Sequence, residues 1–218
     1  MKKKAGPIQK LAIGSAMVKL IADGDRIVDH VRRGSGFEPH SRQLWGIWCG
    51  DGGTVLDVGA YTGLFAIGAA MLGCRVTAFE PMPFNAERLN DNANLNDADM
   101  RIVEAAVSDH DGDTAITFNP KVPFTSGASL IRKKGHKLSV AVMTIDSLNL
   151  PQVTAIKIDV ERGEPLVLAG ARETLARCRP KLLVESLGGD ERAKVMASLT
   201  GYRLADVIDT RNLVLLPC

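Results

Sequence analysis

A short apolar strand, a glycine turn and an apolar helix follow one another early in the chain, and this unit constrains the fold most. The β-branched and apolar run from Thr54 to Val58 predicts a buried strand. The strand ends at Gly59, and the run from Leu64 to Leu72 predicts a mostly buried helix. Glycine lets the backbone approach a ligand, and a helix start offers unpaired N–H groups. The unit is therefore typical of an α/β fold with a nucleotide-type pocket.

The spacing of the turn indicates which ligand it suits. A dinucleotide turn has the pattern G-x-G-x-x-G, whereas this chain has Asp57 at the strand end, followed by Gly59 and Gly63. A carboxylate at that position would repel a pyrophosphate and attract a cationic ligand. S-adenosylmethionine carries an ammonium and a sulfonium group and no phosphate, so the turn favours this cofactor.

A second acid follows the next predicted strand. The strand runs from Arg75 to Phe79, and Glu80 and Pro81 come directly after it. A carboxylate at this position can accept hydrogen bonds from both hydroxyls of a ribose. NAD and S-adenosylmethionine share this feature, and an ordinary acid at a strand end is the simpler alternative.

Five motifs along the chain resemble those of the FkbM family of S-adenosylmethionine-dependent methyltransferases. They are Asp57–Gly63, Ala78–Pro81, Leu89–Asn96, Glu104–Asp109 and Ile156–Glu161. The resemblance extends over about residues 37–185. It implies an α/β fold of the Rossmann-like class I methyltransferase type, with a mostly parallel seven-stranded sheet, helices on both faces and a C-terminal antiparallel hairpin. The last predicted strands, Tyr202–Asp209 and Leu213–Leu216, suit that hairpin.

The resemblance also implies which residues form the cofactor site. They are Asp57, Gly59, Ala60, Tyr61, Thr62, Gly63, Glu80, Pro81, Asn85, Glu104, Ala105, Ala106 and Asp159. Asn85 is expected near the ribose. Many related enzymes have an acid at the Ala105 position to accept from the adenine, so backbone groups or Glu104 must serve here. Glu38, in an aromatic-Glu-Pro run that the family tends to carry, could face the methionine ammonium or be an ordinary loop acid.

The predicted strand over residues 154–160 leads into the acids that we expect to carry the chemistry, Asp159 and Glu161. In a parallel sheet, ligands bind beyond the carboxyl ends of the strands. The i, i+2 spacing directs both side chains to one side if the strand continues. The pair could hold an acceptor hydroxyl, act as a base or bind a divalent metal, although we predict no metal site. His110 and His136 are alternative bases.

The chain departs from the family pattern directly after this pair. The usual run is Asp-Val-Glu-Gly-x-Glu, whereas this chain has Arg162 before Gly163, so the glycine comes one position late. The departure leaves open the backbone path and the part that Glu161 plays. Arg162 could instead recognise an acidic substrate. Glu185, which ends the next predicted strand, could line the same pocket or cap the sheet edge.

Together these features favour an O-methyltransferase that uses S-adenosylmethionine and acts on a hydroxyl of a small molecule, a sugar or glycan, or a polyketide-type metabolite. Two alternatives stay open: an NAD-dependent oxidoreductase, and a methyltransferase-like binding protein without activity. We expect no nucleic-acid acceptor, because Asp159–Glu161 differs from the Asn/Asp-Pro-Pro-aromatic run that holds a flipped base.

Length and composition indicate one domain over residues 1–218. We expect residues 1–50 to form a helical segment on the cofactor site, with one or two helices over residues 8–33, and residues 51–218 to form the core. Four scattered cysteines favour reduced thiols and a cytoplasmic protein. Lys2–Lys4 and the apolar residues 11–18 faintly resemble a signal peptide, but no stretch approaches the ~20 apolar residues of a membrane span.

The stretch over residues 119–137 has no clear periodicity. It contains a basic cluster: Arg132, Lys133, Lys134, His136 and Lys137. A loop of this size inside a compact domain is usually functional. It could cover the acceptor, with the basic cluster meeting a phosphate or carboxylate, or be a solvated loop.

Overall fold

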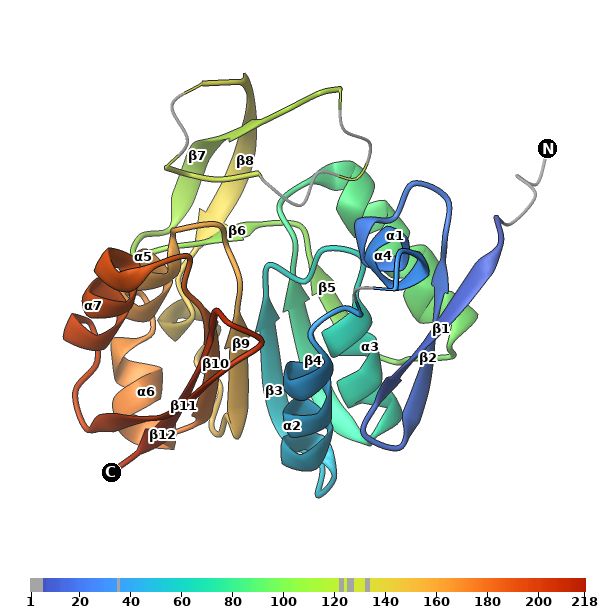
Figure 1. Ribbon diagram of the computed structural model, residues 1–218. Coiled ribbons are helices and arrows are strands. Elements are labelled where there is room, and N and C mark those ends of the chain that lie inside the picture. Colours follow the sequence, from blue (N-terminus) through green and yellow to red (C-terminus); the bar gives the residue numbers. More distant parts are fainter. Residues whose placement is uncertain (1–5, 35, 122–123, 125–127, 132–133) are drawn as a thin grey trace.

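The predicted strand near residue 55 lies inside a seven-stranded sheet in the computed structural model (Figure 1). The structure describes residues 6–34, 36–121, 124, 128–131 and 134–218. From one edge to the other, the strands are β11 Tyr202–Ile208, β12 Asn212–Pro217, β10 Lys181–Glu185, β9 Ala155–Ile158, β3 Gly53–Val58, β4 Cys74–Phe79 and β5 Arg101–Val103. The strands from β10 to β5 run parallel. Strands β12 and β11 add the predicted antiparallel hairpin at one edge.

Side chains alternate between the two faces of this sheet, and each face packs against its own helices. In β3, Val55 joins one apolar cluster and Leu56 the other, and Ala155 and Ile156 of β9 divide in the same way. The first face is covered by α2 Pro39–Cys49, α3 Leu64–Met71 and α4 Pro83–Leu95, and the second by α5 Glu164–Ala169, α6 Arg172–Cys178 and α7 Gly189–Ala197. Burial on both faces explains the continuous apolar runs of the sequence.

The same alternation decides where the acids at the strand ends project. Three apolar residues face α2 and α3: Val55, Ala155 and Leu183. An acid follows each of them on the same strand after an even number of residues: Asp57, Asp159 and Glu185. They therefore project from that face, at the carboxyl ends of β3, β9 and β10. The fold in this way gathers acids that are far apart in the sequence.

Residues 8–21, which we predicted as helix, form an antiparallel hairpin instead. Strands β1 Ile8–Ile13 and β2 Ala16–Ile21 are joined by a turn at Gly14, whose φ is +55°. Buried side chains alternate along both strands: Leu11, Ile13, Val18 and Leu20. The prediction was wrong because a short apolar run fits a helix or a strand, and here the period of two applies.

The rest of the N-terminal segment contains helices, as predicted. Asp25 caps α1 Arg26–Arg32 by accepting hydrogen bonds from the N–H groups of Ile27 and Val28. Helix α2 follows, and its Gly46 packs directly on Gly14, where a Cβ on either residue would overlap the other's backbone. This contact holds the hairpin on α2, on the face of the sheet to which Asp57 projects.

A second, three-stranded sheet stands above one end of the main sheet (Figure 1). Its strands are β6 Ala106–Val107, β7 Gly112–Phe118 and β8 His136–Met143, and the 3-10 helix η1 Asp146–Leu148 follows. The single strand predicted over residues 101–107 was wrong, because β5 pairs with β4 whereas β6 pairs with β8. The helix predicted from residue 164 to about residue 177 is divided at Gly170, which packs on the Ser108 carbonyl with no room for a Cβ.

Parts of two predictions lie outside the described residues. These are the N-terminal Lys2–Lys4, and Arg132 and Lys133 of the basic cluster. Within the described ranges, no helix has the length and apolar character needed to cross a membrane.

Candidate functional site

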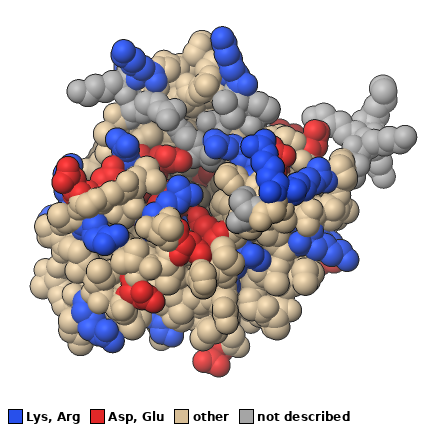
Figure 2. Space-filling model, in the orientation of Figure 1, with Lys and Arg blue, Asp and Glu red and all other residues tan. Residues whose placement is uncertain are grey.

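A cavity of about 520 Å³ opens at the carboxyl ends of β3, β4, β9 and β10. Figure 2 shows acidic side chains gathered in a hollow near the middle of this face, with basic side chains to either side. Most of the predicted site residues line the cavity: Asp57, Gly59, Ala60, Tyr61, Glu80, Pro81, Ala105, Ala106, Asp159 and Glu161. The acids that end neighbouring strands therefore share one cavity.

The other predicted site residues stand behind or beside the cavity wall. Thr62 is buried, and its carbonyl accepts a hydrogen bond from Asn92 Nδ2 at 2.8 Å. Gly63 begins α3 with a φ of +97°, and a Cβ there would overlap the Leu89 side chain. Glu104 is exposed, which leaves Ala105 and Ala106 as the wall at this point.

The glycine turn after β3 is shaped by close contact with the end of β9. Gly59 has a φ of +83°, and a Cβ there would overlap the carbonyl group of Asp159. Tyr61 also adopts a left-handed conformation, with a φ of +51°, and its N–H donates to Glu80 Oε2 at 2.9 Å. The Tyr61 hydroxyl donates to the Phe124 carbonyl at 2.9 Å and accepts from the Arg26 N–H at 3.2 Å. Tyr61 thus joins the turn to the segments on either side of the cavity.

Glu80 is buried and held by three donors. In addition to the Tyr61 N–H, Glu80 Oε1 accepts from the Met82 N–H at 3.0 Å and from Asn85 Nδ2 at 3.2 Å. Burial raises the pKa of Glu80 to about 7, although these hydrogen bonds oppose the shift. Because a carboxylate has about four acceptor positions, capacity for a ligand hydroxyl remains. Asn85 orients Glu80 from behind the wall.

Three buried carboxyl oxygens on the cavity wall have no hydrogen-bond partner among the described residues. Oε2 of Glu185 belongs to the charge cluster described next, and the other two are Oδ1 of Asp57 and Oε2 of Glu38. Burial raises the pKa of Asp57 to about 6 and also raises that of Glu38. Buried acceptors without donors are costly, so both oxygens suit a ligand that brings N–H groups and positive charge. The ammonium of a methionine moiety meets that requirement.

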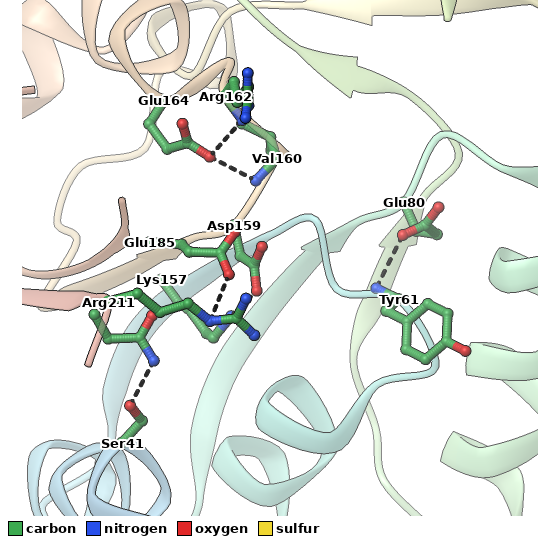
Figure 3. A network of polar contacts seen from close by, with 11 residues as sticks. Ser41, Tyr61, Glu80, Lys157, Asp159, Val160, Arg162, Glu164, Glu185 and Arg211 are labelled. Carbon is green, nitrogen blue, oxygen red and sulfur yellow. Dashed lines mark hydrogen bonds and ion pairs between the residues drawn. The ribbon is translucent and has the colours of Figure 1, made fainter. Parts of the chain in front are cut away.

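Asp159 belongs to a charge cluster at the ends of β9 and β10, in which Lys157 and Glu185 are buried, Asp159 is partly buried and Arg211 is exposed (Figure 3). Lys157 Nζ donates to Asp159 Oδ2 at 3.0 Å, and Arg211 Nε pairs with Glu185 Oε1 at 3.1 Å. Burial opposes ionisation of Asp159, but Lys157 and a hydrogen bond from Glu185 hold its pKa below the ordinary value. Burial, and then the charge of Asp159, raise the pKa of Glu185 to about 9. The two shifts have opposite signs, so a proton shared by the pair is favoured on Glu185 over Asp159.

The strand does not continue to Glu161, so the i, i+2 argument for the pair fails. Strand β9 ends at Ile158, and Glu161 and Arg162 adopt left-handed conformations with φ values of +56° and +83°. The turn is held by Glu164 Oε1, which accepts from the N–H groups of Val160 and Arg162 at 3.1 and 3.2 Å. Arg162 therefore keeps the left-handed position where the family pattern has glycine, whereas Gly163 has a φ of −87°.

Sequence reasoning missed two residues of the cluster, Lys157 and Arg211. Lys157 carried a signal, because it precedes Asp159 by two residues in a predicted strand and so shares its face. No sequence pattern indicated that Arg211 would belong to the site. The hairpin turn is held near the cavity by contacts with α2, in which Asp209 accepts from the N–H groups of His40 and Ser41.

The two histidines predicted as alternative bases, and the arginine predicted to recognise an acidic substrate, do not line the cavity. His110 is exposed and contacts Asp109, and His136 is exposed on β8. Arg162 is mostly exposed and pairs with Glu191 at 3.2 Å outside the cavity. Among the described residues, no group of three or more His, Cys, Asp or Glu side chains could hold a metal ion.

Comparison with known proteins gives one family match. The family model of the methyltransferase FkbM domain matches residues 57–204, more than half of the chain. No curated protein matches the chain.

Solved structures of methyltransferases share the fold. A methyltransferase FkbM from Methylobacillus flagellatus KT has a TM-score of 0.52 and 19% identity, over 77% of this chain and 44% of that one. A tRNA (uracil-54, C5)-methyltransferase from Pyrococcus abyssi, in complex with S-adenosyl-L-homocysteine, has a TM-score of 0.51 and 14% identity, over 96% and 43%. This chain thus spans less than half the length of either. The predicted class I methyltransferase fold is confirmed.

Proposed function

The chain belongs to the FkbM family of methyltransferases, and we propose that it methylates a hydroxyl oxygen of a small molecule, a sugar or glycan, or a polyketide-type metabolite. The observation that carries this proposal is the position of the Asp159 carboxyl, whose Oδ2 accepts from Lys157 Nζ at 3.0 Å. This carboxyl lines the same cavity as Asp57, Gly59 and Glu80. A base is therefore available beside the residues that we assign to the cofactor.

S-adenosylmethionine is the cofactor of this family, which removes the NAD-dependent alternative. We assign its ammonium to the unpartnered oxygens of Asp57 and Glu38, which would each gain a charge-assisted hydrogen bond. We assign its ribose to Glu80, and its adenine to the wall formed by Ala105 and Ala106. When bound, the cofactor supplies a methyl group on a sulfonium, which is already a good leaving group.

The magnitude of the pKa difference restricts what Asp159 can do. A hydroxyl that behaves like water titrates near ~16, and a carboxylate near ~4. Complete deprotonation before attack would cost on the order of 15 kcal/mol at ~1.36 kcal/mol per unit. Asp159 would therefore take up the hydroxyl proton only as the bound cofactor donates its methyl group to the acceptor oxygen, and the cofactor would leave as the neutral thioether. Positioning of the acceptor oxygen supplies much of the remaining rate.

The charge of the cavity bears on the acceptor. Glu38, Asp159 and Glu161 line it, and they would repel a phosphate that entered deeply. We therefore propose a neutral or cationic acceptor rather than a nucleic acid, although one structural relative is named as a tRNA methyltransferase. The basic side chains beside the hollow make RNA a useful arm of the acceptor test.

We propose that residues 1–218 form one domain and that the protein acts in the cytoplasm. Within this domain, the N-terminal segment is proposed to cover the cofactor. The support comes from Arg26, Ile27 and His30 of α1, and from Phe37 and Glu38, which all line the cavity. Residues 1–50 would then help to exclude water from the reacting groups.

Calorimetric titration with S-adenosylhomocysteine tests the cofactor assignment. We expect wild type to bind, and Asp57→Ala to lose roughly ten- to a hundredfold in affinity because a buried charge-assisted hydrogen bond is removed. Asp51→Ala, at an exposed acid near the same strand, is the matched control and should bind like wild type. Equal binding by wild type and Asp57→Ala would contradict the assignment.

A panel of acceptors tests the transfer itself. It should contain sugars, hydroxylated metabolites, amines and an RNA, each with methyl-labelled S-adenosylmethionine. Label on a hydroxyl oxygen that disappears in Asp159→Asn would support the proposal. Label only on RNA or on nitrogen would overturn the acceptor class, and cofactor binding without any transfer would favour the binding protein without activity.

A further inference from the structure

Two carboxyl groups end neighbouring strands in the wall of the cavity. Val184 of β10 pairs with Ile158 of β9, so Glu185 and Asp159 follow at the same level. Adjacent strands are about 4.8 Å apart, and Figure 3 shows the two carboxyls together. Two carboxylates this close in a buried site repel each other strongly, so the pair retains a proton.

The contacts of Asp159 and Glu185 indicate which of the two carboxyl groups carries this proton. Lys157 donates to Asp159, which assigns the negative charge to Asp159. Oε1 of Glu185 accepts from Arg211, whereas its Oε2 is buried and receives no hydrogen bond from a described residue. A proton on Oε2 would give this atom a partner, because it could be donated to Asp159.

Arg211 is held in place by a strained turn. Asp209 and Thr210 have left-handed conformations, with φ values of +48° and +69°, and this conformation is unfavourable for a β-branched residue such as Thr210. The Arg211 carbonyl accepts from the Ser186 N–H at 2.8 Å. Asp209 accepts from the first N–H groups of α2, and Asn212 Nδ2 donates to Ser41 Oγ at 2.8 Å. Strain that is retained beside a site is a reason to assign a function to the turn.

We propose that Glu185 and Arg211 are positioning residues for Asp159. Glu185 donates its proton in a hydrogen bond to Asp159 and so fixes the orientation of that carboxylate, while Arg211 fixes Glu185. The inference rests on the proposed function, in which Asp159 is the base. The other acidic groups that act on Asp159 are Glu38 of the α2 cap, Asp57 of β3 and Glu164 of α5, and each acts on it through its charge.

Infrared spectroscopy of the protein without ligand tests the location of the proton. At pH 8, wild type should show the carbonyl band of a neutral carboxylic acid, and Glu185→Gln should lack it. Glu80→Gln is the control and should keep the band, because Glu80 has a pKa of about 7 and is mostly ionised at pH 8. Absence of the band from wild type, or its survival in Glu185→Gln, would overturn the proposal.

Substitution of the arginine tests the second positioning residue. Arg211→Met should shift the disappearance of the band to higher pH, because a positive charge beside Glu185 is lost, and Arg211→Lys should restore much of the wild-type midpoint. An unchanged midpoint in Arg211→Met would remove Arg211 from the mechanism.

Turnover on the acceptor that the panel identifies tests the role in catalysis. Glu185→Gln keeps a donor toward Asp159 and should retain most activity at pH 7, whereas Glu185→Leu should lose up to about 100-fold. Equal loss in both variants would contradict a positioning role. The infrared result is independent of the cofactor titration, so failure of the positioning role and failure of the proposed function can be told apart.

Discussion

The ends of β3 and β9 lie side by side in the sheet, yet they are built in opposite ways. At the end of β3, Gly59 and Gly63 occupy two of the three left-handed positions and Tyr61 the third, and the Asp57 carboxyl has an oxygen without a donor among the described residues. At the end of β9, Glu161 and Arg162 occupy the left-handed positions, and Asp159 has donors from the protein itself. The first end therefore keeps free hydrogen-bonding capacity, which we assign to the cofactor, whereas at the second end the protein itself supplies a donor to the carboxyl that we propose as the base.

Removal of the internal cation should damage the end of β9 most. Lys157→Met would leave the partly buried Asp159 without its main partner, so we expect the free energy of unfolding to fall by about 3 kcal/mol. Lys194→Met, at an exposed lysine of α7, is the control and should change it by less than about 0.5 kcal/mol. Denaturant unfolding measures both. A loss below about 1 kcal/mol for Lys157→Met would contradict the buried pair.

A side chain in the glycine turn should damage the end of β3. Gly59→Ala would place a Cβ into the Asp159 carbonyl at a left-handed position, so we expect a loss of about 3 kcal/mol. Gly73→Ala has a similar φ of +89° but open space around the Cβ, and it should lose only about 1 kcal/mol. If chemical denaturation gave equal losses, the contact between the turn and β9 would be without consequence.

The raised pKa values predict how stability depends on pH in the protein without ligand. Burial raises the pKa of Asp57 to about 6, of Glu80 and Glu164 to about 7 and of Glu185 to about 9. The folded state binds these protons more tightly than the unfolded state, so their stabilising effect is complete below the unfolded pKa values near 4 and is lost as the pH rises through the folded values. The lowered pKa of Asp159 acts in the opposite direction, but only below about pH 4.

Thermal or denaturant unfolding should therefore give a protein that is less stable at pH 8 than at pH 5, by at least about 2–3 kcal/mol, which is what Glu80 alone contributes at ~1.36 kcal/mol per pKa unit. Glu80→Gln should reduce this difference, because its amide does not titrate. Stability that rises from pH 5 to pH 8 would contradict the buried neutral acids.

The smallest effect concerns the left-handed turn after β9. Arg162→Gly should relieve the strain at a φ of +83°, and Arg162→Ala should keep it, while both lose the contact with Glu191. We expect the glycine variant to be more stable than the alanine variant by about 1 kcal/mol in denaturant unfolding. If the alanine variant were the more stable, glycine would bring no relief at this position.

The same comparison explains which parts of the fold and the site could be predicted. The β3 unit is local: an apolar run, an acid and two glycines lie within ten residues, so Asp57, Gly59 and the following helix follow from the sequence. The cluster around Asp159 depends on Glu185 and Arg211, which come from other elements. No periodicity predicts such contacts, because tertiary packing alone brings the hairpin turn to α2.

The helix prediction for residues 8–21 failed for a related reason. Its apolar residues are compatible with a helix or with strands, and packing on α2 and α3 decides between them. Arg162 is a different case: the sequence showed that the glycine was displaced, but not that the left-handed conformation would remain at residue 162.

A crystal structure with S-adenosylhomocysteine tests the central claim most directly, namely that acids at the ends of neighbouring parallel strands receive a cationic methyl donor. We predict the ligand ammonium within hydrogen-bond distance of Asp57 or Glu38, the ribose hydroxyls at Glu80, and the sulfur facing Asp159. A ligand bound outside this cavity, or with its ammonium directed away from both acids, would contradict the account.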